Sequence, residues 1–237
     1  MKPWNTGGSR GGSAGGSVRK FDSVIFDLDG TLWDAADVTV SAWKKVLSRH
    51  PDAKPAVRID RNTVCLNMGV TNEELAGIFF PDLPFEEAFA LISESCDYEN
   101  EWLPTRGGVL YPGVPETLDR LRREGYRLFV VSNAQDGYVE SFLTAHRLWD
   151  VFEDIESSGR TGQGKAWNIR DVVERRKLSS PVYVGDTVSD SEGAHGAGIP
   201  FVYCRYGFGE TFGNRRTSDW EYAIDRFDEL PGVLERA

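Results

Sequence analysis

Short apolar runs alternate with amphipathic stretches along most of this chain. Apolar runs bounded by polar or turn residues are typical of buried strands. They occupy residues 24–26, 127–131, 182–184 and 200–203, with a weaker candidate at 151–156 and a short edge-strand candidate at 222–224. Because helical patterns separate these runs, the sequence predicts an α/β fold built on a doubly wound, Rossmann-like parallel sheet.

One helix of this fold can be placed from its ends. Pro115 suits the first position of a helix, and Leu118 and Leu121 follow at helical spacing. Gly125 is a suitable residue to end it, because glycine readily adopts the left-handed conformation found just after many helices. A second helix is predicted to close the chain after the edge strand.

The stretch from 34 to 107 indicates helices throughout. Thr71 and Glu74 have the spacing of a capping box, which marks the start of one helix. A longer helix is predicted to begin near Phe85 and to stop at Pro104, because proline interrupts the hydrogen bonds of a helix interior.

These patterns predict a helical domain inserted into an α/β core. The core comprises residues 21–33 and 108–237, and the inserted domain comprises 34–107. Hinges are expected near 33–34 and 106–108. Residues 1–20 are dominated by Gly, Ser and basic residues, so they predict a flexible segment that is neither a secretory signal nor a membrane anchor.

Composition and charge narrow the function. The 237 residues are 40% hydrophobic and 27% charged, which suits a globular protein with a sizeable core. The formal net charge of −10 argues against nonspecific binding to nucleic acid or to an anionic membrane. Three cysteines without the spacing of metal ligands favour reduced thiols and a cytoplasmic location. No apolar run reaches the roughly 18 residues of a transmembrane helix.

Two carboxylates stand where the first predicted strand ends. Asp27 and Asp29 are spaced i and i+2, so on a strand they project to the same side, at the edge where open α/β sheets bind ligands. Like charges held this close need a cation or a shared proton. The pair therefore suggests a carboxylate nucleophile with an acid/base partner that acts on an anionic substrate through a metal.

Further polar clusters follow in order along the chain. Ser132 and Asn133 end the second predicted strand, and Lys165 precedes a helical segment. Asp186 and Asp190 follow the third strand. Because the carboxyl ends of parallel strands share one edge of a sheet, these side chains are expected to meet.

With these motifs the chain resembles the haloacid dehalogenase-like superfamily of phosphatases and phosphotransferases. The four motifs of that superfamily are matched by Asp27/Asp29, Ser132, Lys165 and Asp186/Asp190, and the resemblance covers about residues 21–230. It implies that the inserted helices form a C1 cap, which encloses a small molecule and excludes water during the chemistry.

The resemblance also implies a role for each motif residue. Asp27 would attack phosphorus to form an aspartyl-phosphate, and Asp29 would protonate the leaving oxygen and then activate water. Ser132 and the amide of Asn133 would hold phosphate oxygens at the start of the following helix. Lys165 would neutralise the nucleophile and the transferring phosphoryl group.

A metal site is implied at the same edge. Asp186 would bind Mg²⁺ directly, together with the Asp27 carboxylate and the backbone carbonyl of Asp29, because hard oxygen ligands suit this ion. Asp190 would orient Asp186 or a metal-bound water. Its alternative reading is a helix N-cap or first-turn acid, and the two roles are compatible.

The resemblance favours phosphate-ester hydrolysis or phosphoryl transfer, because dehalogenases lack an acid at the position of Asp29. Thr39 stands where sugar-phosphate mutases place a histidine, which weakens that option. The closest likeness is to phosphoglycolate phosphatase-like hydrolases, a subgroup that also acts on pyrophosphate, sugar phosphates and nucleotides. A small phosphorylated metabolite is the expected partner, and the protein is expected to be a monomer or homodimer.

Two hypotheses from other classes remain open. A receiver-like phosphoacceptor also clusters acids, a Ser or Thr and a Lys on a doubly wound sheet, but it lacks a helical insertion after the first strand. A non-catalytic binding relative would have no use for the intact set of Asp27, Asp29, Lys165 and Asp186.

Overall fold

The computed structural model describes residues 20–212 and 216–236, so nearly all of the predicted flexible segment at 1–20 lies outside the described residues. A parallel sheet forms the centre of the fold, with strand order β5-β4-β1-β6-β7-β8. Its strands are β1 (Ser23–Phe26), β4 (Arg127–Ser132), β5 (Asp154–Ser157), β6 (Pro181–Gly185), β7 (Phe201–Cys204) and β8 (Tyr222–Ile224). The predicted doubly wound sheet is confirmed, and β8 is its edge strand as expected.

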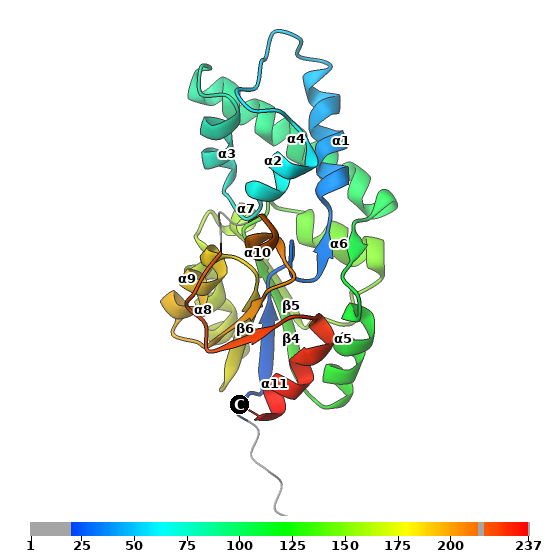
Figure 1. Cartoon of the computed structure of the whole chain (residues 1–237), viewed down its shortest axis with the longest axis vertical. Coiled ribbons are helices and arrows are strands. Elements are labelled where there is room, and N and C mark those ends of the chain that lie inside the picture. The colour runs from blue at the N-terminus through cyan, green and yellow to red at the C-terminus, as the bar shows by residue number, and fades with distance from the viewer. Residues whose placement is uncertain (1–19, 213–215, 237) are drawn as a thin grey trace, which may run out of the picture.

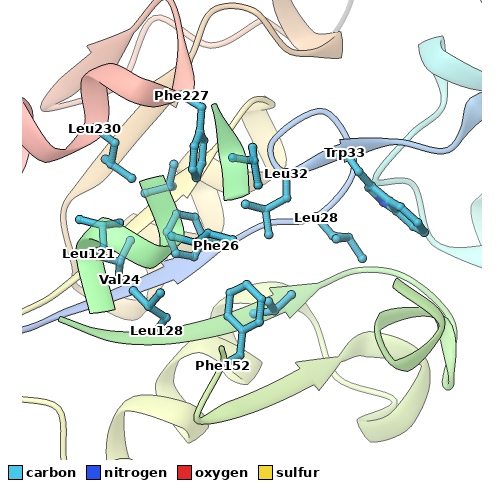
Figure 2. Close-up of a cluster of buried hydrophobic side chains, with 14 of the residues drawn as sticks. Val24, Phe26, Leu28, Leu32, Trp33, Leu121, Leu128, Phe152, Phe227 and Leu230 are labelled. Atoms are coloured by element: carbon cyan, nitrogen blue, oxygen red, sulfur yellow. The ribbon is translucent and has the colours of Figure 1, made fainter. Parts of the chain in front are cut away.

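Alternating side chains of the central strands fill two separate cores. On β1, Val24 and Phe26 enter one core, whereas Ile25 enters the other. The first core is closed by α5 (Val114–Arg123), α6 (Tyr138–His146) and α11 (Leu230–Arg236), and the second by α8 (Lys165–Arg176) and α9 (Val188–Ala197) (Figure 1). Figure 2 shows Phe26 packed among side chains of the first core, including Phe152 and Phe227. Burial on both faces explains why the strands are continuous apolar runs.

The predicted helix after residue 113 begins and ends close to its expected positions. Pro115 is its second residue rather than its first, because α5 begins at Val114. Gly125 has φ +84°, the left-handed conformation expected just after the helix. Shorter elements complete the core, namely α7 (Ser158–Thr161), α10 (Phe208–Phe212) and η1 (Phe227–Glu229).

A helical module lies above the carboxyl ends of the strands (Figure 1). It contains α1 (Ala36–Leu47), α2 (Arg61–Leu66), α3 (Asn72–Phe79) and α4 (Phe85–Arg106). The chain enters and leaves the module through a two-stranded antiparallel ribbon of β2 (Trp33–Asp34) and β3 (Val109–Leu110). The module has its own apolar core, in which Trp43, Phe79 and Ile92 are buried. The predicted capping box of Thr71 and Glu74 is confirmed at the start of α3.

The expectation that Pro104 stops the long helix is wrong. Helix α4 continues through Pro104 to Arg106 and ends at Gly107, which has φ +66°. Proline leaves the carbonyl four residues earlier without its helical donor. Here that carbonyl, of Asn100, accepts a 3.4 Å hydrogen bond from the Ser141 hydroxyl on α6. A tertiary contact thus compensates for the missing bond.

No helix in the described part of the chain is long and apolar enough to cross a membrane. The three cysteines, Cys65, Cys96 and Cys204, are free and buried, as expected from their sequence context.

Candidate active site

The predicted residues from β1, α8 and the turn after β6 meet at the carboxyl edge of the sheet. Lys165 is the first residue of α8, and its Nζ donates to Asp27 Oδ1 at 2.7 Å and to Asp190 Oδ1. Asp27 and Lys165 are each 6% exposed, and Asp190 is fully buried. Burial alone would lower the pKa of Lys165, but the carboxylates of Asp190 and Asp27 raise it above its usual value. The lysine is therefore a fixed cation between two acids.

Asp186 is fixed by the loop after β7. Its Oδ2 accepts hydrogen bonds from the backbone amides of Phe208 at 2.7 Å and Gly209 at 3.2 Å, and its Oδ1 accepts from the Thr31 hydroxyl at 3.3 Å. A Cβ at Gly207 would lie 2.3 Å from Asp186 Cβ and 2.4 Å from the carbonyl oxygen of Gly30. Only glycine fits there.

This close approach gives a test. We expect Gly207→Ala to displace the Asp186 carboxylate and to lower kcat at least about tenfold, because small displacements in a site are costly. Thermal unfolding should show a decrease in Tm of a few degrees, since overpacking costs about 1–3 kcal/mol. An alanine variant with wild-type kcat would show that the loop does not position Asp186.

The acids outnumber the cations of this site. Asp27, Asp29, Asp186 and Asp190 face one lysine, and oxygens of Asp27, Asp186 and Asp190 all lie within 4.8 Å of one another. Burial, together with repulsion from Asp190, raises the pKa of both Asp27 and Asp186. A divalent cation would relieve this repulsion, so the all-oxygen donor set fits a hard metal ion.

Asp190 already uses most of its acceptor capacity. Its Oδ2 accepts from the Asp186 amide at 3.1 Å, from the Thr187 amide at 2.9 Å and from the Thr187 hydroxyl at 2.7 Å. Thr187 and Asp190 form the capping box of α9. The sequence predicted Asp190 either as a helix cap or as the residue that orients Asp186, and its position allows both roles. Besides capping α9, it accepts hydrogen bonds from the Asp186 backbone amide and from Lys165.

Asp29 belongs to the same site but has other partners. It is partly exposed, and its Oδ1 accepts a 2.9 Å hydrogen bond from the Tyr138 hydroxyl at the start of α6. Enclosure by the protein and the nearby Asp27 charge raise its pKa well above the usual range. A raised pKa favours the protonated form, which a general acid requires.

Ser132 and Asn133 lie beside this cluster, but the helix expected directly after them is absent. Helix α6 begins only at Tyr138, so the expectation that a helix N-terminus starts at Ser132 is wrong. The Ser132 hydroxyl instead accepts from the Ala134 amide at 3.2 Å, a local turn that takes the place of a helical turn. Asn133 Nδ2 donates to the carbonyl of Gly69 in the helical module and to the Ser189 hydroxyl, both at 3.1 Å.

A pocket of about 70 Å³ lies between the helical module and the strand ends. The core contributes Asp27, Asp29 and residues 132–135, and the module contributes residues from all four of its helices. Glu99 of α4 lines this pocket, and sequence reasoning missed it together with Tyr138. Met68 and Gly69 of the module also line the pocket, whereas Arg61 pairs with Asp34 and Asp37.

Comparison with known proteins agrees with this geometry. Residues 24–204 match the family described as haloacid dehalogenase-like hydrolase. The chain is 27% identical over 217 residues to the probable phosphatase IndB of Dickeya dadantii, covering 89% of this chain and 92% of that protein. It is 29% identical over 230 residues to a plasmid-encoded phosphoglycolate phosphatase of Cupriavidus necator, covering 91% and 94%. The crystal structure of a predicted phosphoglycolate phosphatase from Haemophilus somnus superposes with a TM-score of 0.74 at 24% identity, covering 92% of this chain and 99% of that one.

Proposed function

We propose that this chain, which belongs to the haloacid dehalogenase-like hydrolase family, is a Mg²⁺-dependent phosphatase that hydrolyses a small phosphate monoester through an aspartyl-phosphate. The observation that carries the proposal is the buried ion pair of Lys165 with Asp27, because Asp27 lines a pocket together with Asp29. The phosphatase names of the relatives support it.

Asp27 and Asp29 have different surroundings and take different roles in the reaction. An Asp27 oxygen attacks phosphorus, the bond from phosphorus to the leaving oxygen breaks, and protonated Asp29 gives its proton to that oxygen. Asp29 then takes a proton from water, whose oxygen attacks phosphorus and breaks the bond to Asp27, releasing inorganic phosphate. Lys165 stabilises the negative charge throughout, while Ser132 and the Asn133 amide hold phosphoryl oxygens.

Asp27, Asp186 and the backbone carbonyl of Asp29 would hold the Mg²⁺ ion, with Asp190 orienting Asp186. When bound, the ion supplies positive charge that offsets repulsion between Asp27 and a phosphate dianion. The chain's own residues prepare this site, because the Phe208 and Gly209 amides fix one Asp186 oxygen. Among the described residues, the other oxygen, Oδ1, accepts only the long contact from the Thr31 hydroxyl.

We further propose that residues 34–107 act as a cap that opens for substrate and closes over it. Polar contacts between cap and core near the pocket include Asn133 to Gly69, Gln135 to Glu99, and Asn100 to the carbonyl of Asp136. Closure would remove water around the phosphoryl group before the attack. The enclosed pocket favours a small metabolite, acted on in the cytoplasm by a monomer or homodimer.

Phosphate release tests the proposal directly. We expect multiple turnovers on at least one member of a panel of phosphate esters with Mg²⁺, and no release above background with excess EDTA. Adding Mg²⁺ back should restore activity, because the bound cation again offsets the repulsion between the carboxylates. Full activity in EDTA would refute the metal, and a single stable phosphoryl group per chain would instead indicate a receiver-like role.

Tyr138 gives a more selective test of Asp29. Tyr138→Phe removes the hydroxyl that donates to Asp29 Oδ1 and keeps the ring. We expect kcat to fall about tenfold with KM nearly unchanged, because a misoriented acid slows chemistry without weakening binding. The pH profile of kcat should shift as well. Unchanged kcat and pH profile would contradict a positioning role for this hydroxyl.

A further inference from the structure

Glu99 is a buried acid of the pocket and has no cationic partner in the part of the chain that the structure describes. It lies on α4, is 5% exposed, and accepts hydrogen bonds from Trp43 Nε1 at 2.5 Å and from Gln135 Nε2 at 3.2 Å. These neutral donors occupy one site on each oxygen, and a carboxylate oxygen can accept more. Glu99 therefore retains acceptor capacity in a space that a substrate would enter.

Apart from its acids, the pocket is lined by uncharged polar side chains and by apolar ones. Within the described chain, the residues that line it include no Lys, Arg or His. Its neutral polar groups are Thr39, Asn67, Asn72, Ser132, Asn133 and Gln135. The Thr39 hydroxyl is buried and interacts with Tyr138, but it forms no hydrogen bond of good geometry among the described residues, so it can still bond to a molecule in the pocket.

The part of this lining that the helical module contributes suits the leaving group, whereas Asp27, Ser132 and Asn133 lie on the phosphoryl side. Asp29, the proposed acid for the leaving oxygen, lines the same pocket as Glu99, whereas Lys165 contacts Asp27 from outside its lining. The phosphoryl group therefore meets the positive charge, and the alcohol that departs meets Glu99 and Thr39.

We propose that Glu99 selects phosphate esters of uncharged, hydroxyl-bearing alcohols and discriminates against esters whose leaving group carries a carboxylate. Burial raises the pKa of Glu99 to about 7, so the group is an anion above that pH. Hydroxyl groups of the leaving group can then donate to Glu99 and bond to Thr39, whereas a carboxylate would be desolvated beside a like charge. This inference rests on the proposed phosphatase function and goes further, because it predicts that 2-phosphoglycolate is a poor substrate despite the names of several relatives.

The test compares kcat/KM for glycerol 3-phosphate and 2-phosphoglycolate with Mg²⁺ at a single pH above the pKa of Glu99, where its carboxylate is ionised. Ionisations that affect both substrates equally cancel in the ratio of the two values. We expect wild type to prefer glycerol 3-phosphate by at least about tenfold. Glu99→Gln keeps the size and removes the charge, and it should reduce this preference about tenfold, mainly through a lower KM for 2-phosphoglycolate. Glu101→Gln, on the exposed side of the same helix, should leave the ratio unchanged.

A second variant tests the proposal even if a change at Glu99 prevents folding. Thr39→Val replaces the hydroxyl with a methyl group of similar size and should lower kcat/KM several-fold for glycerol 3-phosphate, with little change for 2-phosphoglycolate. A wild-type preference for 2-phosphoglycolate, or an unchanged ratio in Glu99→Gln, would overturn the inference. So would a preference for phosphoethanolamine lost in Glu99→Gln, which would mean that Glu99 binds an ammonium group.

The proposed function has its own readout in the same experiment. Metal-dependent release from p-nitrophenyl phosphate together with the wrong selectivity would overturn the inference and leave the phosphatase function standing. No release from any ester by folded protein would overturn both.

Discussion

The Asp27→Asn variant is expected to lose at least about four orders of magnitude in kcat while remaining folded. The amide cannot act as the nucleophile, so no aspartyl-phosphate forms, and the proposed reaction has no other route. The fold should tolerate the change, because the substitution removes one of the crowded acids whose repulsion raises the pKa of its neighbours. Single-turnover phosphate release and a thermal melt measure the two effects.

Two companion variants make this result specific. Asp37→Asn alters an exposed acid on α1 and should retain wild-type kcat. Asp29→Asn should also lose turnover, but for a different reason, because the nucleophile is intact and only proton transfer is lost. Phosphorylated protein trapped in Asp29→Asn and absent from Asp27→Asn would assign the nucleophile. Phosphate release by Asp27→Asn within tenfold of wild type would refute the assignment.

The fold was predictable from sequence because its signals are local. Buried parallel strands are short apolar runs, and the polar residues at their ends are adjacent to them in sequence, as Asp27 is to β1 and Asp186 is to β6. Once the strands are parallel, their ends meet without further information. Lys165 could be placed at the same edge for a similar reason, because it begins the helix that precedes β6.

Other features depend on contacts between distant segments. Glu99 and Tyr138 lie at ordinary helical positions. Glu99 lines the pocket because the helical module lies over the sheet, and Tyr138 reaches Asp29 because the core helix α6 packs beside the end of β1. The amides that hold Asp186 come from a loop about 20 residues further along the chain. Pro104 was misjudged for the same reason, because a serine on α6 supplies the donor to the carbonyl that the proline leaves free.

The second large effect is expected for Lys165→Met, which should reduce both stability and activity. Methionine fills a similar volume but leaves Asp27 and Asp190 without their buried cation. Removing one partner of such a pair costs about 3–5 kcal/mol, which corresponds to a decrease in Tm of roughly 10 °C for a protein of this size. Loss of the cation beside the phosphoryl group should lower kcat at least about a thousandfold.

A double variant separates the two effects. In Lys165→Met with Asp190→Asn, the asparagine Oδ1 can still accept from the Asp186 and Thr187 amides, while the unpaired charge is gone. We expect this variant to recover several degrees of Tm but none of the lost kcat, because stability depends on the balance of buried charge and catalysis depends on the cation itself. Saturating Mg²⁺ should likewise raise the Tm of the single variant without restoring kcat. A single variant with wild-type Tm would show that the ion pair adds nothing to the fold, and recovered kcat in the double variant would show that Lys165 acts only by neutralising Asp190.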